Sequence, residues 1–510
     1  MPSSRRIALL LALILLGLLP PAAGYTHTRL PRTSAQDVAP AGQILHVGPG
    51  QMYTIPSQAA LVAQDGDTID IDAGTYLNDS AIWQANNLII RGVGGMAHIS
   101  SSGLIPNGKA IWVISGQNTT IDHIEFSGAR VAVQNGAGIR QEGAGLTVSQ
   151  CYFHDNEEGI LAGDNSSSDI VIEYSEFANN GFGDGYTHNM YINKVRTFTL
   201  RYSYSHHADV GHTVKSRAFE NRILYNRIMD EASGTASYTI DLPNGGRSYL
   251  IGNVLQQGPN TQNPGIISYG AEGGNNPDQH LYVVNNTIVN DRSNGGTFIK
   301  VVGSVPALVE NNIFVGAGTP YDGPGTSNLT NNLVTSDAGL ADRASFDYRL
   351  VAGSAAIDAG TDPGSINGVS LAPAYEYVHP RDKQDRMIVG ILDIGAYEYA
   401  PSATEPPAAP SALSAIAKSF AQIDLAWADT ASNETGFKIE RRMGTSGVYV
   451  QIAVVGTNAV AFSDRFGLKP TTQYFYRVRA TNVKGDSGYS NETSATTLVG
   501  IQRFVPLLKR

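Results

Sequence analysis

The sequence has little cysteine and little charge. Its 510 residues include one cysteine, Cys151, which excludes an internal disulfide framework. Only 16% of the residues are charged and the net charge is −10, which argues against general binding to nucleic acid or to acidic membrane surfaces. Outside residues 8–19 no run is apolar enough to span a bilayer. Glycine is abundant instead, with 55 residues, and this favours many short strands joined by tight turns.

Residues 1–24 have the pattern of a secretory signal peptide. Arg5 and Arg6 form a basic start, residues 8–19 form an apolar run too short for a comfortable membrane span, and residues 22–24 are small enough for cleavage. We therefore expect a secreted protein, extracellular or on the cell surface, with a retained membrane anchor as the alternative. Residues 25–41 are polar and predict a flexible lead-in.

A short sequence motif recurs through the middle of the chain. A small or amide residue precedes an apolar one by two positions at the end of a β-rich stretch, and the copies are 20 to 33 residues apart. The copies begin at Cys151, Ser175, Ser203, Asn226, Asn253, Asn286, Asn312 and Asn332. A repeat of this length indicates a solenoid whose stacked coils bury one continuous core. We expect these residues to form an interior ladder at turns, with Cys151 as a small buried member, so that chemistry lies on outward-facing positions.

The short strands predict an all-β fold. Residues 42–399 contain them, beginning with a short helix at 56–63 and a strand at 68–72, and ending with a closing element at 347–399. These features resemble the right-handed parallel β-helix proteins of the pectate-lyase-like superfamily over about residues 45–399. That superfamily includes lyases, hydrolases, epimerases and phage spike proteins, so the resemblance is specific for fold and only suggestive for activity.

A second domain follows a spacer. Residues 400–410 contain four prolines and predict a semi-rigid linker. Residues 411–498 have a β-sandwich pattern that resembles a fibronectin type III domain, with Tyr474 as its tyrosine corner. We expect this domain to be a spacer or a cell-surface adhesion module. The tail, residues 499–510, is either a sorting or anchoring signal or a frayed end.

Strand alternation selects an outward column of polar residues. If the apolar residues beside them point inward, Tyr191, Lys215 and Asp241 point outward at separations of 24 and 26 residues, about one coil each. Strands lie roughly 4.8 Å apart, so the column spans about 10 Å, close to two sugar units. Further candidates near this column are His188, Asn189, His207, His212, Arg217 and Asn244.

The charge of the same region suggests an acidic substrate. Residues 194–227 hold seven lysines and arginines against two acids, a formal +5 in an acidic protein. A lyase acting on a uronate polymer must neutralise a carboxylate, remove the neighbouring proton and protonate the leaving oxygen. Lys215 fits the base, Arg217 the carboxylate clamp and Tyr191 the acid, with His212 close by. Asn189, His188, His207, Asp241 and Asn244 are the expected substrate contacts.

A second resemblance is confined to about 40 residues. His212-Thr213-Val214-Lys215-Ser216-Arg217, the following Asn221-Arg222-Ile223-Leu224-Tyr225-Asn226 and the later Gly252-Asn253 resemble the chondroitinase B and alginate lyase family. The resemblance implies that Lys215 is the base. The family's Arg-His-Gly turn is replaced by residues 241–245, Asp-Leu-Pro-Asn-Gly, and its calcium-binding Glu-x-Glu by residues 207–210, His-Ala-Asp-Val. Calcium therefore has one candidate ligand, Asp209.

Three functions remain open from the sequence. The first is a secreted lyase, or a C5-epimerase that begins with the same proton abstraction, acting on an acidic polysaccharide. The second is a non-catalytic cell-surface protein that binds or adheres to glycans. The third is a β-helix glycoside hydrolase, which needs two or three close carboxylates and has only Asp209 and Asp241 nearby.

Overall fold

The computed structural model describes residues 42–400, 405–431, 433–482 and 484–499. The predicted signal peptide and lead-in, part of the linker and nearly all of the tail lie outside these residues. In the described ranges, no helix is long and apolar enough to cross a membrane.

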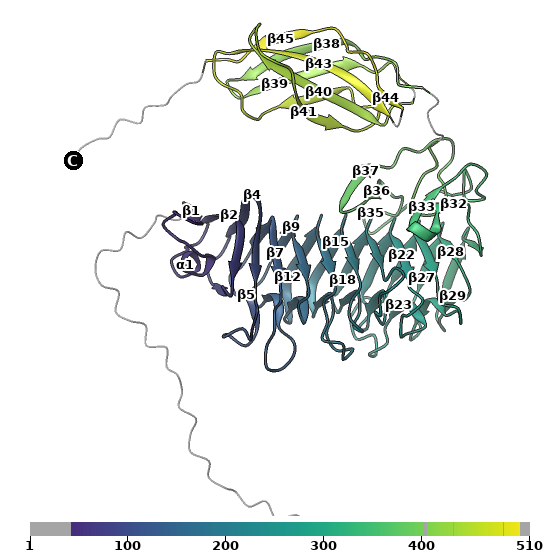
Figure 1. The fold of residues 1–510 in the computed structure, drawn as a ribbon. Coiled ribbons are helices and arrows are strands. Elements are labelled where there is room, and N and C mark those ends of the chain that lie inside the picture. Colours follow the sequence, from purple (N-terminus) through teal and green to yellow (C-terminus); the bar gives the residue numbers. More distant parts are fainter. Residues whose placement is uncertain (1–41, 401–404, 432, 483, 500–510) are drawn as a thin grey trace, which may run out of the picture. The chain divides into compact units, whose positions relative to one another are not determined.

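Residues 44–335 form a parallel β-helix with three strands per coil (Figure 1). The first face is a ten-stranded sheet: β3 (Ala81–Trp83), β5 (Ala110–Ile114), β8 (Ala137–Gln141), β11 (Glu158–Ala162), β14 (Met190–Ile192), β17 (Val214–Ser216), β20 (Ile240–Leu242), β23 (Gly265–Tyr269), β26 (Thr297–Val301) and β29 (Thr319–Asp322).

The second face begins with β1 (Ile44–Val47) and the first parts of β2 (Thr68–Leu77) and β4 (Ile89–Ser100). It continues through β6 (Thr119–Asp122), β9 (Leu146–Ser149), β12 (Asn165–Glu173), β15 (Val195–Arg201), β18 (Glu220–Leu224), β21 (Arg247–Ile251), β24 (Leu281–Val284), β27 (Ala307–Glu310) and β30 (Ser327–Thr330).

The third face begins with the later parts of β2 and β4, which join it to the second face. It continues through β7 (Ile124–Ser127), β10 (Tyr152–His154), β13 (Glu176–Ala178), β16 (Tyr204–His206), β19 (Arg227–Met229), β22 (Val254–Gln257), β25 (Thr287–Asn290), β28 (Ile313–Val315) and β31 (Leu333–Thr335). The predicted strand at 68–72 is the start of β2, and the predicted helix is α1 (Pro56–Ala60).

The predicted interior ladder is confirmed. From Cys151 to Asn312, the backbone N–H of each repeated residue donates to the side chain of the next, at 2.9–3.1 Å. Cys151 is fully buried and burial raises the pKa of its thiol to about 12, so it is a structural residue and not a nucleophile. Because the ladder occupies the inside of one corner, function is confined to the outer surface of the coils.

The segment after β31 covers the third face. It contains β32 (Leu340–Asp342), η1 (Arg343–Ser345), β33 (Asp347–Leu350), β34 (Ser365–Ile366), β35 (Val369–Ser370), β36 (Tyr375–Val378) and β37 (Asp382–Asp385). Tyr348 and Tyr377 pack in one buried cluster with Tyr204 and Ile313, which lie on strands four coils apart. The closing element therefore lies along the β-helix, where it shields outward apolar side chains that would otherwise meet water.

Residues 411–496 form an antiparallel β-sandwich. One sheet holds β38 (Ser411–Ser419), β39 (Gln422–Ala428) and β42 (Ala461–Asp464). The other holds β40 (Gly436–Met443), β41 (Val450–Val455), β43 (Gln473–Asn482), β44 (Gly485–Asp486) and β45 (Thr493–Thr496). The Tyr474 hydroxyl accepts a hydrogen bond from the Lys469 backbone N–H at 2.8 Å, the contact expected of a tyrosine corner.

Candidate functional site

The first face carries the predicted outward column. Tyr191 on β14 is in register with Lys215 on β17, and Lys215 is in register with Asp241 on β20. Strand alternation therefore predicted the register of these three residues correctly, but Asp241 is only 3% exposed, so its predicted role as a substrate contact is wrong. Tyr191 packs against a buried apolar cluster that includes Val113 and Leu161.

Two cations lie over the ring of Tyr191. The Lys215 Nζ is 5.1 Å and the Arg217 Cζ 5.0 Å from the ring centroid, within the range of cation–π attraction. Both cations also contact Glu272: Lys215 Nζ lies 3.7 Å from Oε1, and Arg217 donates to Oε2. Glu272 lies in the loop after β23 with its side chain about half exposed, whereas the Lys215 and Arg217 side chains are mostly covered. The site thus holds a carboxylate between a lysine and an arginine.

Asp241 and His212 form a buried pair below this surface. His212 Nε2 lies 3.4 Å from Asp241 Oδ2, and the His212 Nδ1 accepts from the Tyr238 backbone N–H at 3.4 Å. Burial raises the pKa of Asp241 to about 6, with Lys215 opposing the rise. Burial and then Lys215 lower the pKa of His212 to about 3, so this imidazole is neutral near pH 7. The neutral His212 imidazole therefore adds no positive charge beside Lys215.

His188 and Asn189 are not substrate contacts in this structure. Both are fully buried. Asn189 precedes β14 in a corner, where its amide accepts from Asn180 and donates to Ser205 as part of a second interior ladder. Strand alternation does not apply at a corner, so Asn189 points inward there and its predicted role as a substrate contact is wrong. His188 stacks on His212 with ring centroids 4.6 Å apart and supports Tyr191 edge-on.

Asn244 and His207 also lie elsewhere than predicted. Asn244 is buried in the turn after β20, and its backbone carbonyl accepts from Gln279 at 3.1 Å. His207 follows β16 on the third face, where its ring contacts His206 and Ser233. Asn244 is therefore covered within the turn, and His207 faces a different side of the coil from Lys215.

The predicted basic patch is wrong. Arg196, Arg201 and Arg222 lie on the second face and pair with acids there, and Arg227 pairs with Glu231 near the third face. A charge count along the chain ignores that one coil turns through three faces. Lys215 and Arg217 remain as a local pair of cations on the first face.

The region that would correspond to the family's calcium site does not fit calcium. Asp209 is exposed in the corner after β16, and the residues around it, His207, Ala208 and Val210, supply no second carboxylate. Calcium takes six to eight oxygen ligands, so one carboxylate does not make a site. Within the described part of the chain, Asp209 joins no group of three metal-ligating side chains.

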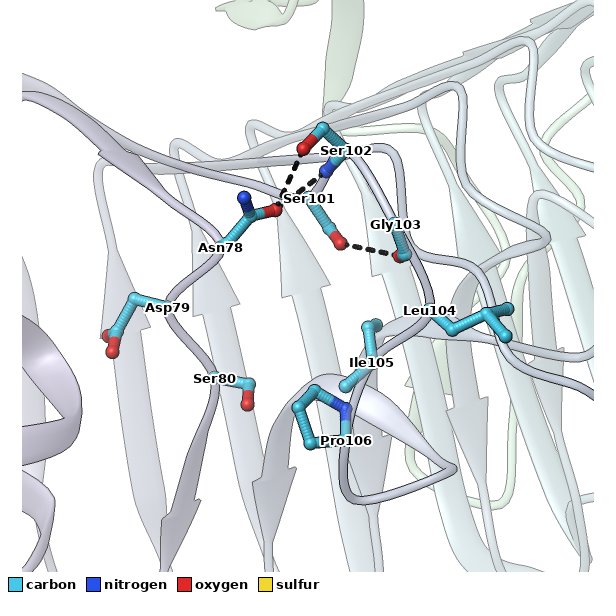
Figure 2. A pocket seen from close by; sticks show the side chains of 9 residues that line it. All are labelled: Asn78, Asp79, Ser80, Ser101, Ser102, Gly103, Leu104, Ile105 and Pro106. Carbon is cyan, nitrogen blue, oxygen red and sulfur yellow. Dashed lines mark hydrogen bonds between the residues drawn. The ribbon is translucent and has the colours of Figure 1, made fainter.

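A separate pocket of about 250 Å³ lies near the start of the β-helix (Figure 2). Its lining comes from residues 78–80 and 101–106, and its one carboxylate, Asp79, accepts from the Ser57 backbone N–H in α1 at 2.9 Å. Lys215 lies five strands along the first face from β3, roughly 24 Å at the usual strand spacing. This pocket has no basic group in its lining, and we place no reaction there.

Sequence reasoning missed Glu272. It lies 57 residues after Lys215 in a loop, so neither the coil spacing nor strand alternation points to it. Only the fold brings the loop after β23 back over β17.

Comparisons with known proteins support the fold. Residues 70–255 match a family model described as a right handed beta helix region. The structure of pectate lyase Pel9A is similar over 70% of this chain and 97% of that one, with 14% identity and a TM-score of 0.50. At that identity the likeness shows the parallel β-helix and nothing about substrate. No curated protein matches the chain.

Other similar structures match a fifth of the chain. A Fn3-like protein from Clostridium thermocellum is 25% identical over 20% of this chain and all of its own, with a TM-score of 0.16. Titin kinase with its flanking domains is 21% identical over 19% of this chain, with a TM-score of 0.17. This chain spans a third or less of the first solved structures that it matches, from 15% to 32% of their lengths.

Proposed function

We propose that this protein is a secreted polysaccharide lyase, or a closely related C5-epimerase, that acts on an acidic, uronate-containing polysaccharide. The signal-like residues 1–24 favour a location outside the cell, and the β-sandwich or the tail would hold the protein near a cell surface. The partner is the polymer itself, and the acidic net charge disfavours nucleic acid.

One observation supports this proposal most. Glu272 places a carboxylate against both Lys215 and Arg217, the two cations that lie over the ring of Tyr191. A uronate carboxylate has the same charge and shape as the Glu272 head group. We take the position of Glu272 as the position that the substrate carboxylate occupies when this exposed loop moves aside.

The reaction then follows from the arrangement. Arg217 binds the substrate carboxylate and stabilises the charge that develops on it when C5 loses its proton. The Lys215 Nζ accepts that proton, the C5–H electron pair forms the C4–C5 double bond, and the C4–O bond breaks. The Tyr191 hydroxyl donates a proton to the leaving oxygen. In an epimerase the proton returns to C5 from the opposite side instead, and no bond to oxygen breaks.

The other two functions have less support. A hydrolase would need Asp209 and Asp241 together, but Asp209 is exposed in a corner and Asp241 is buried on the first face. For a binding protein without catalysis, the supporting observation is that Glu272 keeps both cations paired.

The test is an assay of the secreted form against alginate, polygalacturonate, chondroitin sulfate, dermatan sulfate and heparin-type glycans. Ultraviolet absorbance reports the unsaturated sugar that β-elimination leaves, and proton exchange at C5 in deuterated water reports epimerisation. Lys215→Ala should lower turnover by at least about a hundredfold, the usual contribution of a general base. Lys300→Ala is the matched control, because Lys300 is an exposed outward lysine of the same face, three strands further on.

The outcomes separate the three functions. Absorbance or C5 exchange that Lys215→Ala removes and Lys300→Ala retains supports the proposal. Retained turnover in a folded Lys215→Ala protein refutes it. New reducing ends without absorbance would indicate a hydrolase, and saturable binding without any product would indicate a binding protein.

A further inference from the structure

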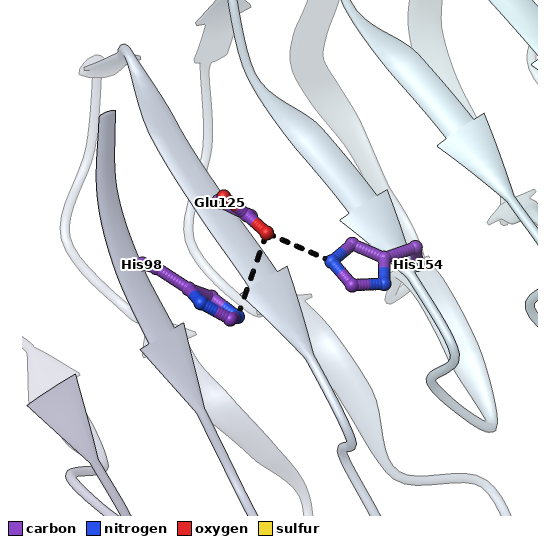
Figure 3. Close-up of side chains that lie close together, drawn as sticks. All are labelled: His98, Glu125 and His154. Carbon is purple, nitrogen blue, oxygen red and sulfur yellow. Dashed lines mark hydrogen bonds and ion pairs between the residues drawn. The ribbon is translucent and has the colours of Figure 1, made fainter. Parts of the chain in front are cut away.

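Three metal-ligating side chains meet on the third face, near the start of the β-helix. His98 lies on β4, Glu125 on β7 and His154 on β10, which are three successive strands. One donor atom from each lies within 4.8 Å of the other two, and Figure 3 shows the Glu125 carboxylate between the two imidazole rings. Within the described ranges this is the only group of three or more such side chains with this geometry.

The coil geometry explains why they meet. His98 is in register with Glu125, and Tyr152 is in register with Glu125 from the other side. His154 is two residues beyond Tyr152, so its side chain points to the same outward side, at the next outward position of β10. The separations of 27 and 29 residues are one coil each, the same period that builds the ladder.

The distances suit a single ion. His154 Nε2 lies 2.9 Å and His98 Nε2 3.6 Å from Glu125 Oε1. Ligand bonds of about 2.0–2.1 Å in a tetrahedral site place donor atoms about 3.3 Å apart. These two separations lie on either side of that value, and all three donor atoms lie within 4.8 Å of one another, so an ion between them requires only small side-chain movements.

A second carboxylate orients one of the histidines. Asp155 Oδ2 lies 2.7 Å from His154 Nδ1, which leaves Nε2 directed at Glu125. Metal-bound histidines commonly have such a carboxylate on the other ring nitrogen, because it fixes the ring and raises its basicity. The Tyr152 ring stacks on His154 at 4.4 Å and restricts it further.

The site is open to ions from solvent. The His98, Glu125 and His154 side chains are 26%, 24% and 19% exposed.

We propose that His98, Glu125 and His154 bind one zinc-class divalent ion through two Nε2 atoms and one carboxylate oxygen. The ion would cross-link three successive coils near the start of the β-helix. Two imidazole ligands select zinc-class metals over calcium and magnesium, which prefer all-oxygen sites. This site does not depend on the proposed lyase activity, because it lies on another face from Lys215.

The test is a calorimetric titration of zinc chloride into the untagged, chelator-treated full chain. We expect one zinc per chain, undisplaced by excess calcium or magnesium, and visible absorption bands of four-coordinate Co²⁺ when cobalt replaces zinc. His98→Ala and His154→Ala should each weaken binding by more than about tenfold, since loss of an outer carboxylate alone costs 10- to 100-fold. Asp155→Asn should weaken it by about tenfold.

His123→Ala is the matched control. His123 also contacts a neighbouring aspartate at 2.7 Å, that of Asp122, but it is outside the group of three. The His123→Ala variant should bind zinc with the same affinity and stoichiometry as the unchanged protein. Absence of saturable zinc binding, or equal affinity and stoichiometry in folded His98→Ala and His154→Ala, would overturn the site. Zinc that raises the melting temperature of His98→Ala as much as that of the unchanged protein would overturn the cross-link.

Discussion

Replacing Asp241 by asparagine should stabilise the β-helix at neutral pH. The carboxyl is 3% exposed, its Oδ1 has no hydrogen-bond partner, and burial raises its pKa from 3.8 to about 6. Between these two values the folded protein keeps a proton that the unfolded chain has released, so the free energy of unfolding falls as the pH rises through this window. A shift of about two units at roughly 1.4 kcal/mol each gives a loss of about 3 kcal/mol above pH 6.

Asparagine has nearly the same shape and no charge, so Asp241→Asn should not show this loss. The difference in unfolding free energy between variant and unchanged protein should grow by about 3 kcal/mol from pH 3.5 to pH 7.5. A packing difference between the two side chains is the same at both pH values and cancels. His212, whose lowered pKa makes the protein less stable in acid, is present in both proteins.

Urea unfolding in a Trp427→Phe background measures this difference. The remaining tryptophans, Trp83 and Trp112, are fully buried in the β-helix, so their fluorescence reports on that domain and not on the sandwich. Equal differences at the two pH values would refute the reasoning, as would a variant that loses stability relative to the unchanged protein as the pH rises. Turnover should also fall in Asp241→Asn. The Asp241 carboxylate destabilises the fold and lies beside Lys215, and proteins commonly keep a destabilising group where their function needs it.

Three further predictions concern the ladder, the loop and the charge. Asn253→Ala should lower the free energy of unfolding by about 3 kcal/mol or more, measured by urea unfolding, because it removes the four buried hydrogen bonds of the amide; a loss below 1 kcal/mol would contradict the ladder's role. Glu272→Gln should tighten binding of an acidic polymer up to about fivefold in a low-salt titration, since an exposed ion pair is worth about 1 kcal/mol or less, and weaker binding would mean that Glu272 does not compete with the substrate. Arg222→Ala should leave polymer binding unchanged, because Arg222 pairs with Glu220 on another face. A large loss of affinity in this variant would instead support the broad basic patch.

The sequence alone determined the repeat and what depends on it. A period of one coil fixes which residues stack, so the ladder through Asn226 and Asn253 and the outward column through Tyr191, Lys215 and Asp241 follow from spacing and alternation. The all-β class follows from the same pattern.

The tertiary structure decided everything at corners and in loops. Alternation holds only within a strand, so it misplaced Asn189, and a charge count along the chain merged residues that lie on three different faces. Glu272 reaches Lys215 from a loop whose path no local pattern encodes. His98, Glu125 and His154 are one coil apart in the sequence, yet only the register of β4, β7 and β10 brings the three outward side chains to ligand distance.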